Sequence, residues 1–325
     1  MSRSISATPR VAVVIPCYNE EAVIGSVVED FRKNLPDAQI YVIDNNSIDD
    51  TAGAARRADA YVIHEAQKGK GNAVRRAFAE IDADVYVMTD GDGTYDATRA
   101  PEMVDALVHE HLDMVVGTRH TDSEDAYRKG HRFGNKMLNR VLRFLFEEKF
   151  EDILSGYRVF SRRFVKTFPA LSAGFEIETE MSIHAIHMGC PTKEIATQYF
   201  DRGEGTASKL NTYRDGLRIL FTMLMMFRHL RPLAMFLAVS CVLLVLTLVL
   251  GLPVVFHFLE TGMVPRLPTA VAAAGLMVMS VVTFVTGIIL DSITYSLKTN
   301  KRLAYLQQRS GVGGYTPQKD NGEAS

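Results

Sequence analysis

The stretch VYVMTDGDGTYD, residues 85–96, places an apolar run directly before a turn rich in aspartate and glycine. The run Val85–Thr89 has the composition of a buried strand. Asp90 and Asp92 lie one residue apart on this turn, so they can hold one hard divalent cation and leave positions for phosphate oxygens. The alternative is a solvated turn, because Asp and Gly are common turn formers. The strand that leads directly into the pair favours the metal-binding interpretation.

Short β-branched runs alternate with amphipathic stretches on both sides of this segment, which predicts an α/β fold with a doubly wound, mainly parallel sheet. The predicted strands are Val11–Ile15, Ile40–Asp44, Tyr61–His64, Val85–Thr89 and Met114–Gly117. The predicted helices between them are Glu20–Asn34, Thr51–Ala58, Asn72–Ile81 and Arg99–Glu110. Polar clusters follow the strand ends, where the ligand crevice of an open α/β sheet lies. We therefore expect these clusters to converge on one site.

The region that follows is less regular. We expect helices at Tyr127–Phe146 and Glu176–Met188, and strands at Tyr157–Phe160 and Lys193–Tyr199. Residues 210–230 alternate arginines with large apolar side chains, a pattern typical of an amphipathic helix in a membrane interface. The alternative is an ordinary surface helix, and the neighbouring apolar segment favours the interface.

Two segments, Leu233–Phe258 and Leu267–Leu290, carry no formal charge. Each exceeds the roughly 20 apolar residues that a helix needs to cross a hydrocarbon core. A buried helical hairpin of a soluble protein is the alternative, and runs of this length disfavour it. Lys and Arg residues flank the outer ends of the pair, so the positive-inside bias predicts a multi-pass membrane protein with its large domain and both termini in the cytoplasm.

Several classes of function are disfavoured by composition and spacing. The net charge of −2 shows no basic surplus for a nucleic-acid partner. Cys17, Cys190 and Cys241 are too scattered for a disulfide framework or a zinc site. No G-x-G-x-x-G follows the first strand, which disfavours a nicotinamide cofactor. The segment KGKGN, residues 68–72, lacks the Walker A spacing, although its glycines and lysines at a helix start suit an anion.

Taken in order, the motifs resemble those of family-2 glycosyltransferases, specifically the polyprenyl-phosphate branch that includes dolichol-phosphate mannose synthases and bactoprenol-phosphate glucosyltransferases. The segments that carry the resemblance are VVIPCYNEE, VIDNNSIDDT, KGKGNAVR, DGDGTYD, VVGTRH, DILSGYRVFSRR and FDRGEGTASKL, followed by the two apolar spans. Each motif is modest alone, and the ordered set is specific. The chain has no Trp, so it lacks the Q-x-x-R-W signature of related processive polysaccharide synthases.

The resemblance implies a GT-A-like nucleotide-sugar domain over residues 1–209, a juxtamembrane amphipathic helix over 210–231 and a transmembrane hairpin over 232–292. Residues 293–325 would form a cytoplasmic tail with a disordered end. The implied nucleotide-binding residues are Pro16, Tyr18, Glu20, Ile43, Asp44, Asn45, Lys70, Asp90 and Gly91. The family often has two consecutive Asp residues where this chain has Asp44-Asn45, which leaves the base open between uracil and another.

The resemblance also implies a Mg²⁺ or Mn²⁺ cofactor held by Asp90 and Asp92, and catalytic roles for Asp92 and Asp152. Asp152 would lie near the acceptor, unless it only caps the following turn. The cations expected to bind the lipid phosphate or the diphosphate are Arg119, Arg132, Arg158, Arg202 and Lys209. A guanidinium matches phosphate oxygens in pairs, and the alternative for each arginine is a plain surface residue.

The implied reaction is a single inverting transfer of a sugar from a UDP- or GDP-linked donor to a polyprenyl phosphate of the undecaprenyl or dolichyl type. A phosphate monoester has its second pKa near ~6, so it is a dianion at neutral pH and needs no strong base. Glycoside hydrolysis is disfavoured because two carboxylates on one tight turn cannot flank a sugar. The remaining alternatives are a silent nucleotide-sugar-binding membrane scaffold and a non-lipid acceptor. The implied partners also include the lipid bilayer and a second copy of the chain in a homo-oligomer.

Overall fold

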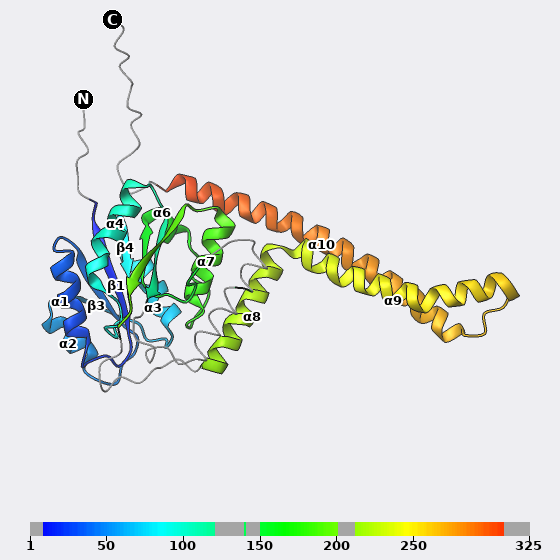
Figure 1. Cartoon of the computed structure of the whole chain (residues 1–325), viewed down its shortest axis with the longest axis horizontal. Helices are drawn as coiled ribbons and strands as arrows, with labels where there is room; N and C mark the ends of the chain where they lie inside the picture. The colour runs from blue at the N-terminus through cyan, green and yellow to red at the C-terminus, as the bar shows by residue number, and fades with distance from the viewer. Residues whose placement is uncertain (1–8, 121–139, 141–149, 201–211, 309–325) are drawn as a thin grey trace, which may run out of the picture. The chain divides into compact units, whose positions relative to one another are not determined.

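The computed structural model describes residues 9–120, 140, 150–200 and 212–308 (Figure 1). The chain divides into two compact units, of which the first contains residues 1–222 together with 303–325 and the second contains residues 223–302. The first unit holds the sheet and the second holds most of the two long apolar helices. The predicted helix Tyr127–Phe146 lies outside the described residues except for Arg140.

The first unit is built on a seven-stranded sheet with the order β3-β2-β1-β4-β6-β5-β7. The strands are β1 (Val11–Cys17), β2 (Gln39–Asp44), β3 (Tyr61–His64), β4 (Val85–Met88), β5 (Met114–His120), β6 (Arg158–Ser161) and β7 (Thr192–Gln198). All neighbouring strands are parallel except β6, which runs antiparallel to both β4 and β5. This topology confirms the predicted doubly wound, mainly parallel α/β fold.

Strand β5 is longer than the sequence pattern predicts. The prediction ended at Gly117, because polar residues follow, but the strand continues to His120. Its partner β7 supplies the reason, since their register runs from Met114↔Thr192 to His120↔Gln198. Each residue of β5 pairs with a residue of β7 that lies 78 positions later in the sequence. Local composition cannot indicate that such a distant strand extends the hydrogen-bonded ladder. This extension carries Arg119 out toward the carboxyl end of the sheet.

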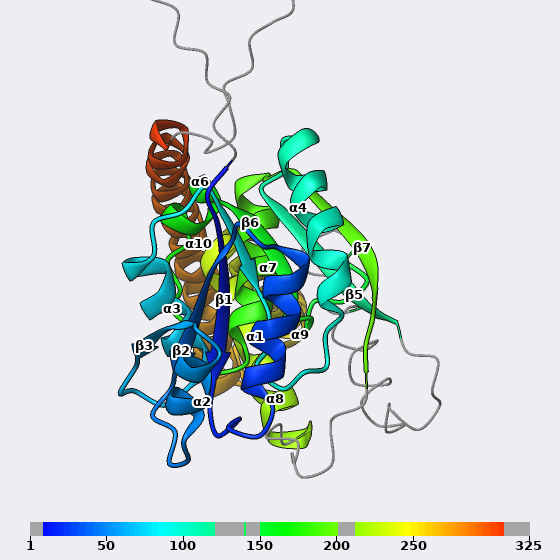
Figure 2. The ribbon, with the colours of Figure 1, turned by 90° about the vertical axis from the view of Figure 1, so that its left-hand side faces the viewer.

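Helices cover both faces of the sheet (Figure 2). On one face, buried side chains of α1 (Ile24–Asn34), α2 (Thr51–Arg57) and α4 (Ala100–His109) join alternate strand residues such as Val13 and Ile15 in one hydrophobic core. The other face carries α3 (Lys70–Glu80), α6 (Arg162–Thr167) and α7 (Ile177–Met188). There Phe78 of α3 packs edge-on against Tyr86, Phe160 and Phe168. Successive side chains of a strand point to opposite faces of the sheet, and helices cover both faces. Apolar residues therefore occur on both faces.

Helix α8 (Thr212–Leu230) precedes the two long helices α9 (Pro232–Thr261) and α10 (Leu267–Gln307). Both α9 and α10 are long and apolar enough to cross a membrane. They meet at a pair of small residues, where each serine hydroxyl, Ser240 and Ser280, donates to the other's carbonyl at 3.0 and 2.9 Å. Small residues let two apolar helices approach closely. Helix α10 also continues well beyond Leu290, where the uncharged run ends.

The C-terminal turn of α10 belongs to the first unit and packs against the sheet. The Tyr305 side chain is buried, and its hydroxyl donates to Oδ2 of Asp113, which lies just before β5 and is fully buried. The other carboxylate oxygen of Asp113 accepts from Ser161 Oγ at 2.7 Å and pairs with Arg163. The Arg163 guanidinium lies over the Tyr305 ring, 4.9 Å from its centroid. The end of the second long helix is thus held by a buried polar cluster.

Replacing Tyr305 with Phe should lower the melting temperature of the full-length protein by several degrees. The change removes one donor to a buried carboxylate, a loss of about 1–3 kcal/mol that corresponds to a few degrees for each kcal/mol in a domain of this size. The measurement is a thermal melt in detergent followed by circular dichroism. The matched control is Tyr295→Phe on the same helix, because Tyr295 is 74% exposed. Equal melting of both variants would show that the Tyr305 hydroxyl does not stabilise the fold.

Candidate functional site

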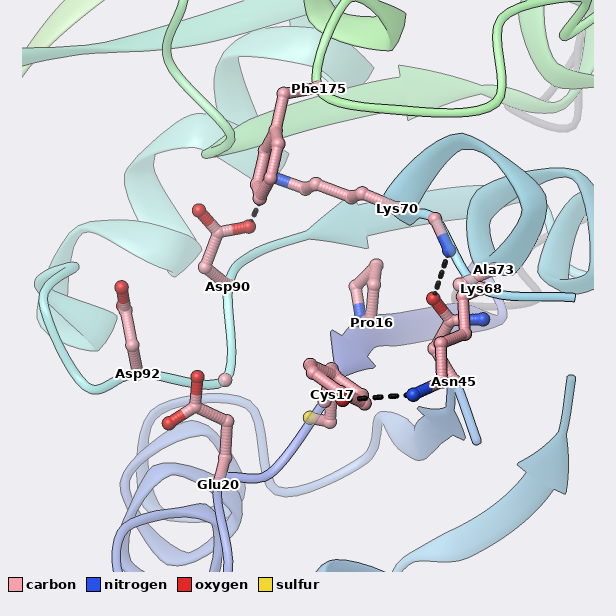
Figure 3. Close-up of a pocket in the computed structure, with 13 residues that line it drawn as sticks. Pro16, Cys17, Glu20, Asn45, Lys68, Lys70, Ala73, Asp90, Asp92 and Phe175 are labelled. Atoms are coloured by element: carbon pink, nitrogen blue, oxygen red, sulfur yellow. Dashed lines mark hydrogen bonds and ion pairs between the residues drawn. The ribbon is translucent and has the colours of Figure 1, made fainter. Parts of the chain in front are cut away.

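A pocket of about 300 Å³ opens at the carboxyl ends of β1, β2 and β4, where the sheet order reverses (Figure 3). This is where open α/β sheets bind their ligands. The pocket is lined by Pro16, Cys17, Tyr18, Glu20, Asn45, Lys68, Gly69, Lys70, Ala73, Asp90, Gly91, Asp92 and Phe175. Most of the residues predicted to bind a nucleotide and a metal therefore lie together. Ile43 and Asp44 are not among the lining residues, because both are buried in the sheet beside it.

The loop after β4 presents the two aspartates. Asp92 is buried, and its Oδ1 atom accepts hydrogen bonds from the hydroxyl and the amide of Thr94 at 2.6 and 3.3 Å. Gly93 has φ = +72°, a left-handed conformation that glycine adopts without strain. The side chains of Asp90 and Asp92 both reach into the pocket (Figure 3).

The donor set of the pocket fits a hard divalent cation. Within the described part of the chain, no group of three or more His, Cys, Asp or Glu residues could hold a metal by itself. Asp90 and Asp92 would therefore supply two oxygen ligands, and phosphate oxygens and water would complete the coordination. Mg²⁺ and Mn²⁺ favour such sites, in which one or two carboxylates act together with substrate phosphates.

Lys70 lies at the start of α3 and bridges two carboxylates. Its ammonium forms ion pairs with Oδ1 of Asp90 and, at 2.5 Å, with Oε1 of Glu178 on α7. Both Lys70 and Glu178 are buried, with 9% and 4% of their side-chain surface exposed. Burial alone would lower the pKa of Lys70, but the two carboxylates overcome that effect and raise the pKa above its usual value. Burial raises the pKa of Glu178, and Lys70 opposes this without cancelling it.

Asn45, which lines the pocket, forms hydrogen bonds with the loop between β3 and α3. Its Oδ1 atom accepts the Gly69 amide at 2.6 Å, and its Nδ2 atom donates to the Gln67 carbonyl at 2.6 Å. An aspartate in its place would accept the first hydrogen bond but could not donate the second. The departure from two consecutive aspartates therefore has a local structural reason. Lys68, on the same loop, donates to the Tyr18 hydroxyl at 3.0 Å.

Asp44 is engaged beside the pocket rather than in it. Its Oδ2 atom lies 3.0 Å from His64 Nδ1, and its Oδ1 atom accepts the Ser47 amide at 3.2 Å. These contacts hold the turn after β2 in place. Asp44 therefore shapes the pocket indirectly, by fixing the turn that follows Asn45.

Arg119 and Asp152 form a bidentate pair at the ends of β5 and the loop before β6. The Arg119 Nε and Nη2 atoms donate to the two Asp152 oxygens at 2.6 and 2.8 Å. The Arg119 guanidinium also lies 5.6 Å from the centroid of the Tyr199 ring. Tyr199 packs against Tyr95, which follows the two aspartates of the β4 loop in the sequence. The structure thus places this pair close to the loop that carries Asp90 and Asp92.

Arg158 lies in a different place from the one predicted for it. The sequence offered it as a phosphate-binding or surface arginine, but the side chain is fully buried. Its guanidinium donates to the carbonyls of Ser155 and Ile153 at 2.9 and 2.8 Å and to the Ser182 hydroxyl at 3.0 Å. A side chain without exposed surface cannot reach a lipid phosphate. Arg158 instead fixes the turn between Asp152 and β6, which is a correction to the sequence-based assignment.

Three other predicted cations, Arg132, Arg202 and Lys209, lie outside the described residues. The predicted site residues did not include the pocket-lining residues Cys17, Ala73 and Phe175, nor Glu178, which pairs with Lys70. One sequence feature could have indicated Glu178. The predicted helix at residues 176–188 carries several acidic residues among apolar ones, and they do not gather on one solvent-facing side. Ten of the twelve residues of α7 are buried, so its acidic side chains need partners inside the protein. Glu180 accepts hydrogen bonds from the Leu171 and Ser172 amides, and Glu178 forms an ion pair with Lys70.

Comparisons with known proteins show which family this chain belongs to. The model of the family described as "Glycosyl transferase family 2" matches residues 12–168. The chain is 40% identical over 208 residues to glycosyltransferase AglJ of Haloferax volcanii, which covers 63% of this chain and 68% of that protein. It is 30% identical over 208 residues to the dolichyl-phosphate hexose transferase of the same organism, covering 64% of this chain and 90% of the relative. Protein RfbJ of Shigella flexneri is 55% identical over 123 residues, or 38% of this chain and 95% of that protein.

Among solved structures, glucosyl-3-phosphoglycerate synthase from Mycobacterium tuberculosis has a TM-score of 0.56 at 22% identity, covering 66% of this chain and 79% of that chain. The same synthase in complex with Mn²⁺, UDP and glucosyl-3-phosphoglycerate has a TM-score of 0.55 at 21% identity, covering 66% and 80%. These likenesses show a shared fold. The family match and the sequence relatives together show that the chain belongs to glycosyl transferase family 2 and is a glycosyltransferase.

Proposed function

We propose that this protein transfers a sugar, with inversion, from a nucleoside diphosphate sugar to a polyprenyl phosphate at a membrane. One observation carries the proposal. The chain has a pocket at the strand ends that is lined by Asp90 and Asp92, and it also has two helices long enough to cross a bilayer. A soluble acceptor would not require membrane residence. The relative named as a dolichyl-phosphate hexose transferase supports a lipid phosphate acceptor.

The pocket supplies what a nucleoside diphosphate sugar needs. Pro16, Tyr18 and Asn45 line the end that lies at β1 and β2, where a base and ribose would bind. Lys70 is the first residue of α3 and Lys68 lies two residues before it, so a helix N-terminus and two ammonium groups favour a diphosphate here. A divalent cation held by Asp90 and Asp92 would neutralise the charge that develops on the leaving diphosphate.

The acceptor side is proposed to lie at Arg119 and Asp152. Asp152 holds the guanidinium in a fixed fork geometry, and Arg119 keeps 15% of its side-chain surface exposed. A phosphate dianion can share the remaining donors of this guanidinium, because the fork presents more N–H groups than one carboxylate can accept. The phosphate itself is the nucleophile, so the site needs orientation and charge balance rather than a strong base.

The proposed location is a membrane, with the catalytic domain and both termini in the cytoplasm. Helix α8 exposes the apolar side chains of Leu217, Phe221 and Leu224, and it carries arginines along its length. Such a helix suits the interface beside the first span. Lys298, Lys301 and Arg302 extend beyond the uncharged part of α10, in agreement with the positive-inside bias. Assembly into a homo-oligomer is part of the same expectation.

The test uses the purified full-length protein in detergent, with Mn²⁺ or Mg²⁺ and a panel of radiolabelled UDP- and GDP-sugars. The acceptors are undecaprenyl phosphate, dolichyl phosphate and, as a matched control, undecaprenol without its phosphate. We expect label from one donor to enter the organic phase with the phosphorylated lipids only, and chelation of the metal to stop it. Metal-dependent binding of UDP or GDP without lipid transfer would favour another acceptor. An absence of both would favour a silent membrane scaffold.

A further inference from the structure

Lys70 contacts two carboxylates that have different positions relative to the pocket. Asp90 lines the pocket, whereas Glu178 pairs with Lys70 but is not among the lining residues. The Glu178 carboxylate is almost fully buried, and its Oε2 atom has no hydrogen-bond partner within the described parts of the chain. Burying a carboxylate with so few partners is unfavourable for stability. The contact with Lys70 therefore points to a functional role for Glu178.

Two cations would compete for Asp90 in the working enzyme. One is the Lys70 ammonium, which pairs with Oδ1, and the other is the divalent cation of the proposed donor complex. An ammonium that is buried and loses its only counter-charge carries a large desolvation cost. Lys70 does not face that cost, because Glu178 Oε1 already lies 2.5 Å from its Nζ atom.

The surroundings restrict where the ammonium can go. A Cβ atom placed on Gly156 would lie 2.8 Å from Lys70 Nζ, which shows how closely the ammonium approaches the turn before β6. Phe175 lies beside Lys70 and Asp90 at the pocket wall (Figure 3). Glu178 provides a second counter-charge for Lys70 from a residue that does not line the pocket.

We propose that Glu178 is a positioning residue that retains Lys70 beside the diphosphate and allows Asp90 to exchange its lysine partner for the divalent cation. The proposal rests on the proposed function in one respect, namely that Asp90 and Asp92 hold the metal of a nucleoside diphosphate sugar. Glu178 acts through Lys70 and does not touch the substrate. Without it, Lys70 would have Asp90 as its one carboxylate partner in this cluster and would oppose metal binding.

The experiment is a double-mutant cycle on metal binding by the full-length protein in detergent, without acceptor and therefore without turnover. Mn²⁺ binding is measured from the loss of the free-ion electron paramagnetic resonance signal, with and without UDP, against protein-free UDP and Mn²⁺ solutions. The variants are Glu178→Gln, Lys70→Met and the two combined. Partners behind a metal ligand commonly contribute 10- to 100-fold in affinity, so Glu178→Gln should weaken Mn²⁺ binding by about 10-fold or more.

The same substitution should have almost no effect in the Lys70→Met background, because Glu178 would then have no lysine to hold. Glu178→Asp keeps the charge and should retain more of the affinity than Glu178→Gln. The matched control is Glu180→Gln, because Glu180 is equally buried on the same helix but binds backbone amides instead of Lys70. This control should leave Mn²⁺ affinity unchanged. Circular dichroism melts identify any variant that has lost its fold.

The outcomes separate the two proposals. If the unmodified protein binds no Mn²⁺ even with UDP, the metal site of the proposed function is wrong and this inference fails with it. If the unmodified protein binds Mn²⁺ and Glu178→Gln binds it equally well, only the positioning role is wrong. The positioning role is also overturned if Glu178→Gln weakens binding equally in both backgrounds, because Glu178 would then act on the metal through its own charge. Should Glu178→Gln fail to fold, the comparison of Glu178→Asp in the two Lys70 backgrounds decides the question.

Discussion

Replacing Asp92 with Asn should reduce sugar transfer by about 1,000-fold or more while leaving the fold intact. The asparagine Oδ1 atom can still accept the hydrogen bonds from the Thr94 amide and hydroxyl, so the β4 loop keeps its shape. What is lost is one of the two charges proposed to hold the divalent cation. Metal stabilisation of a leaving diphosphate amounts to several kcal/mol, and each ~1.4 kcal/mol changes a rate tenfold.

The measurement is the initial rate of label transfer over a range of Mn²⁺ concentrations, together with a thermal melt. Asp96→Asn is the matched control, because Asp96 lies on the same loop but accepts from the Thr98 amide and hydroxyl at 2.9 and 2.6 Å, at the start of a short 3₁₀ helix. It should retain most of the activity. Transfer by Asp92→Asn at a rate near that of the unmodified protein would rule out Asp92 as a metal ligand.

Replacing Gly156 with Ala should reduce transfer by about 100-fold without a comparable loss of stability, since misplacing a reacting group by about 1 Å can have an effect of that size. The added Cβ atom would lie 2.8 Å from Lys70 Nζ and 2.9 Å from each carboxylate oxygen of Asp90. These atoms are the ends of flexible side chains, so they can shift and the fold can survive. Their displacement would nevertheless move a proposed metal ligand.

The position also has no backbone reason to be glycine, because Gly156 is not among the glycines with positive φ. Its amide donates to the Tyr95 hydroxyl at 2.8 Å, and alanine would keep this hydrogen bond. The measurement compares the transfer rate and the melting temperature of the variant with those of Gly25→Ala, a helical glycine with open space around it. If Gly156→Ala transfers sugar as fast as Gly25→Ala does, the close packing of Lys70 and Asp90 has no bearing on catalysis.

Features that depend on neighbours in the sequence were predicted well. The strand β3 has the predicted bounds, and α7 begins one residue after the predicted start, because each depends on the local pattern of apolar residues. The Asp90–Asp92 pair is likewise local, since a glycine-flanked turn after a buried strand presents both carboxylates on one side. Helix α10 shows the limit of this reasoning, because it continues through a polar stretch to Gln307, beyond the uncharged run.

Partners distant in the sequence could not be predicted in this way. The sequence predicts that Arg158 binds a phosphate. In the structure its guanidinium instead donates hydrogen bonds to the carbonyls of Ser155 and Ile153 and to the Ser182 hydroxyl. Arg119 and Asp152 were both expected near the acceptor, but their bidentate pairing appears only where β5 and the loop before β6 meet. In each case an identical side chain in another environment would have a different role.

Local sequence patterns predict the α/β class, the two long apolar helices and the acidic pair after β4, because periodicity, length and spacing are local properties. Three contacts could be seen only in the folded protein: Glu178 pairs with Lys70, Arg158 is buried, and Tyr305 donates to Asp113, 192 residues away in the sequence. The physical reason is that burial and ion pairing depend on which segments the sheet brings together. A charged side chain acquires its role from the partners that exclude water around it.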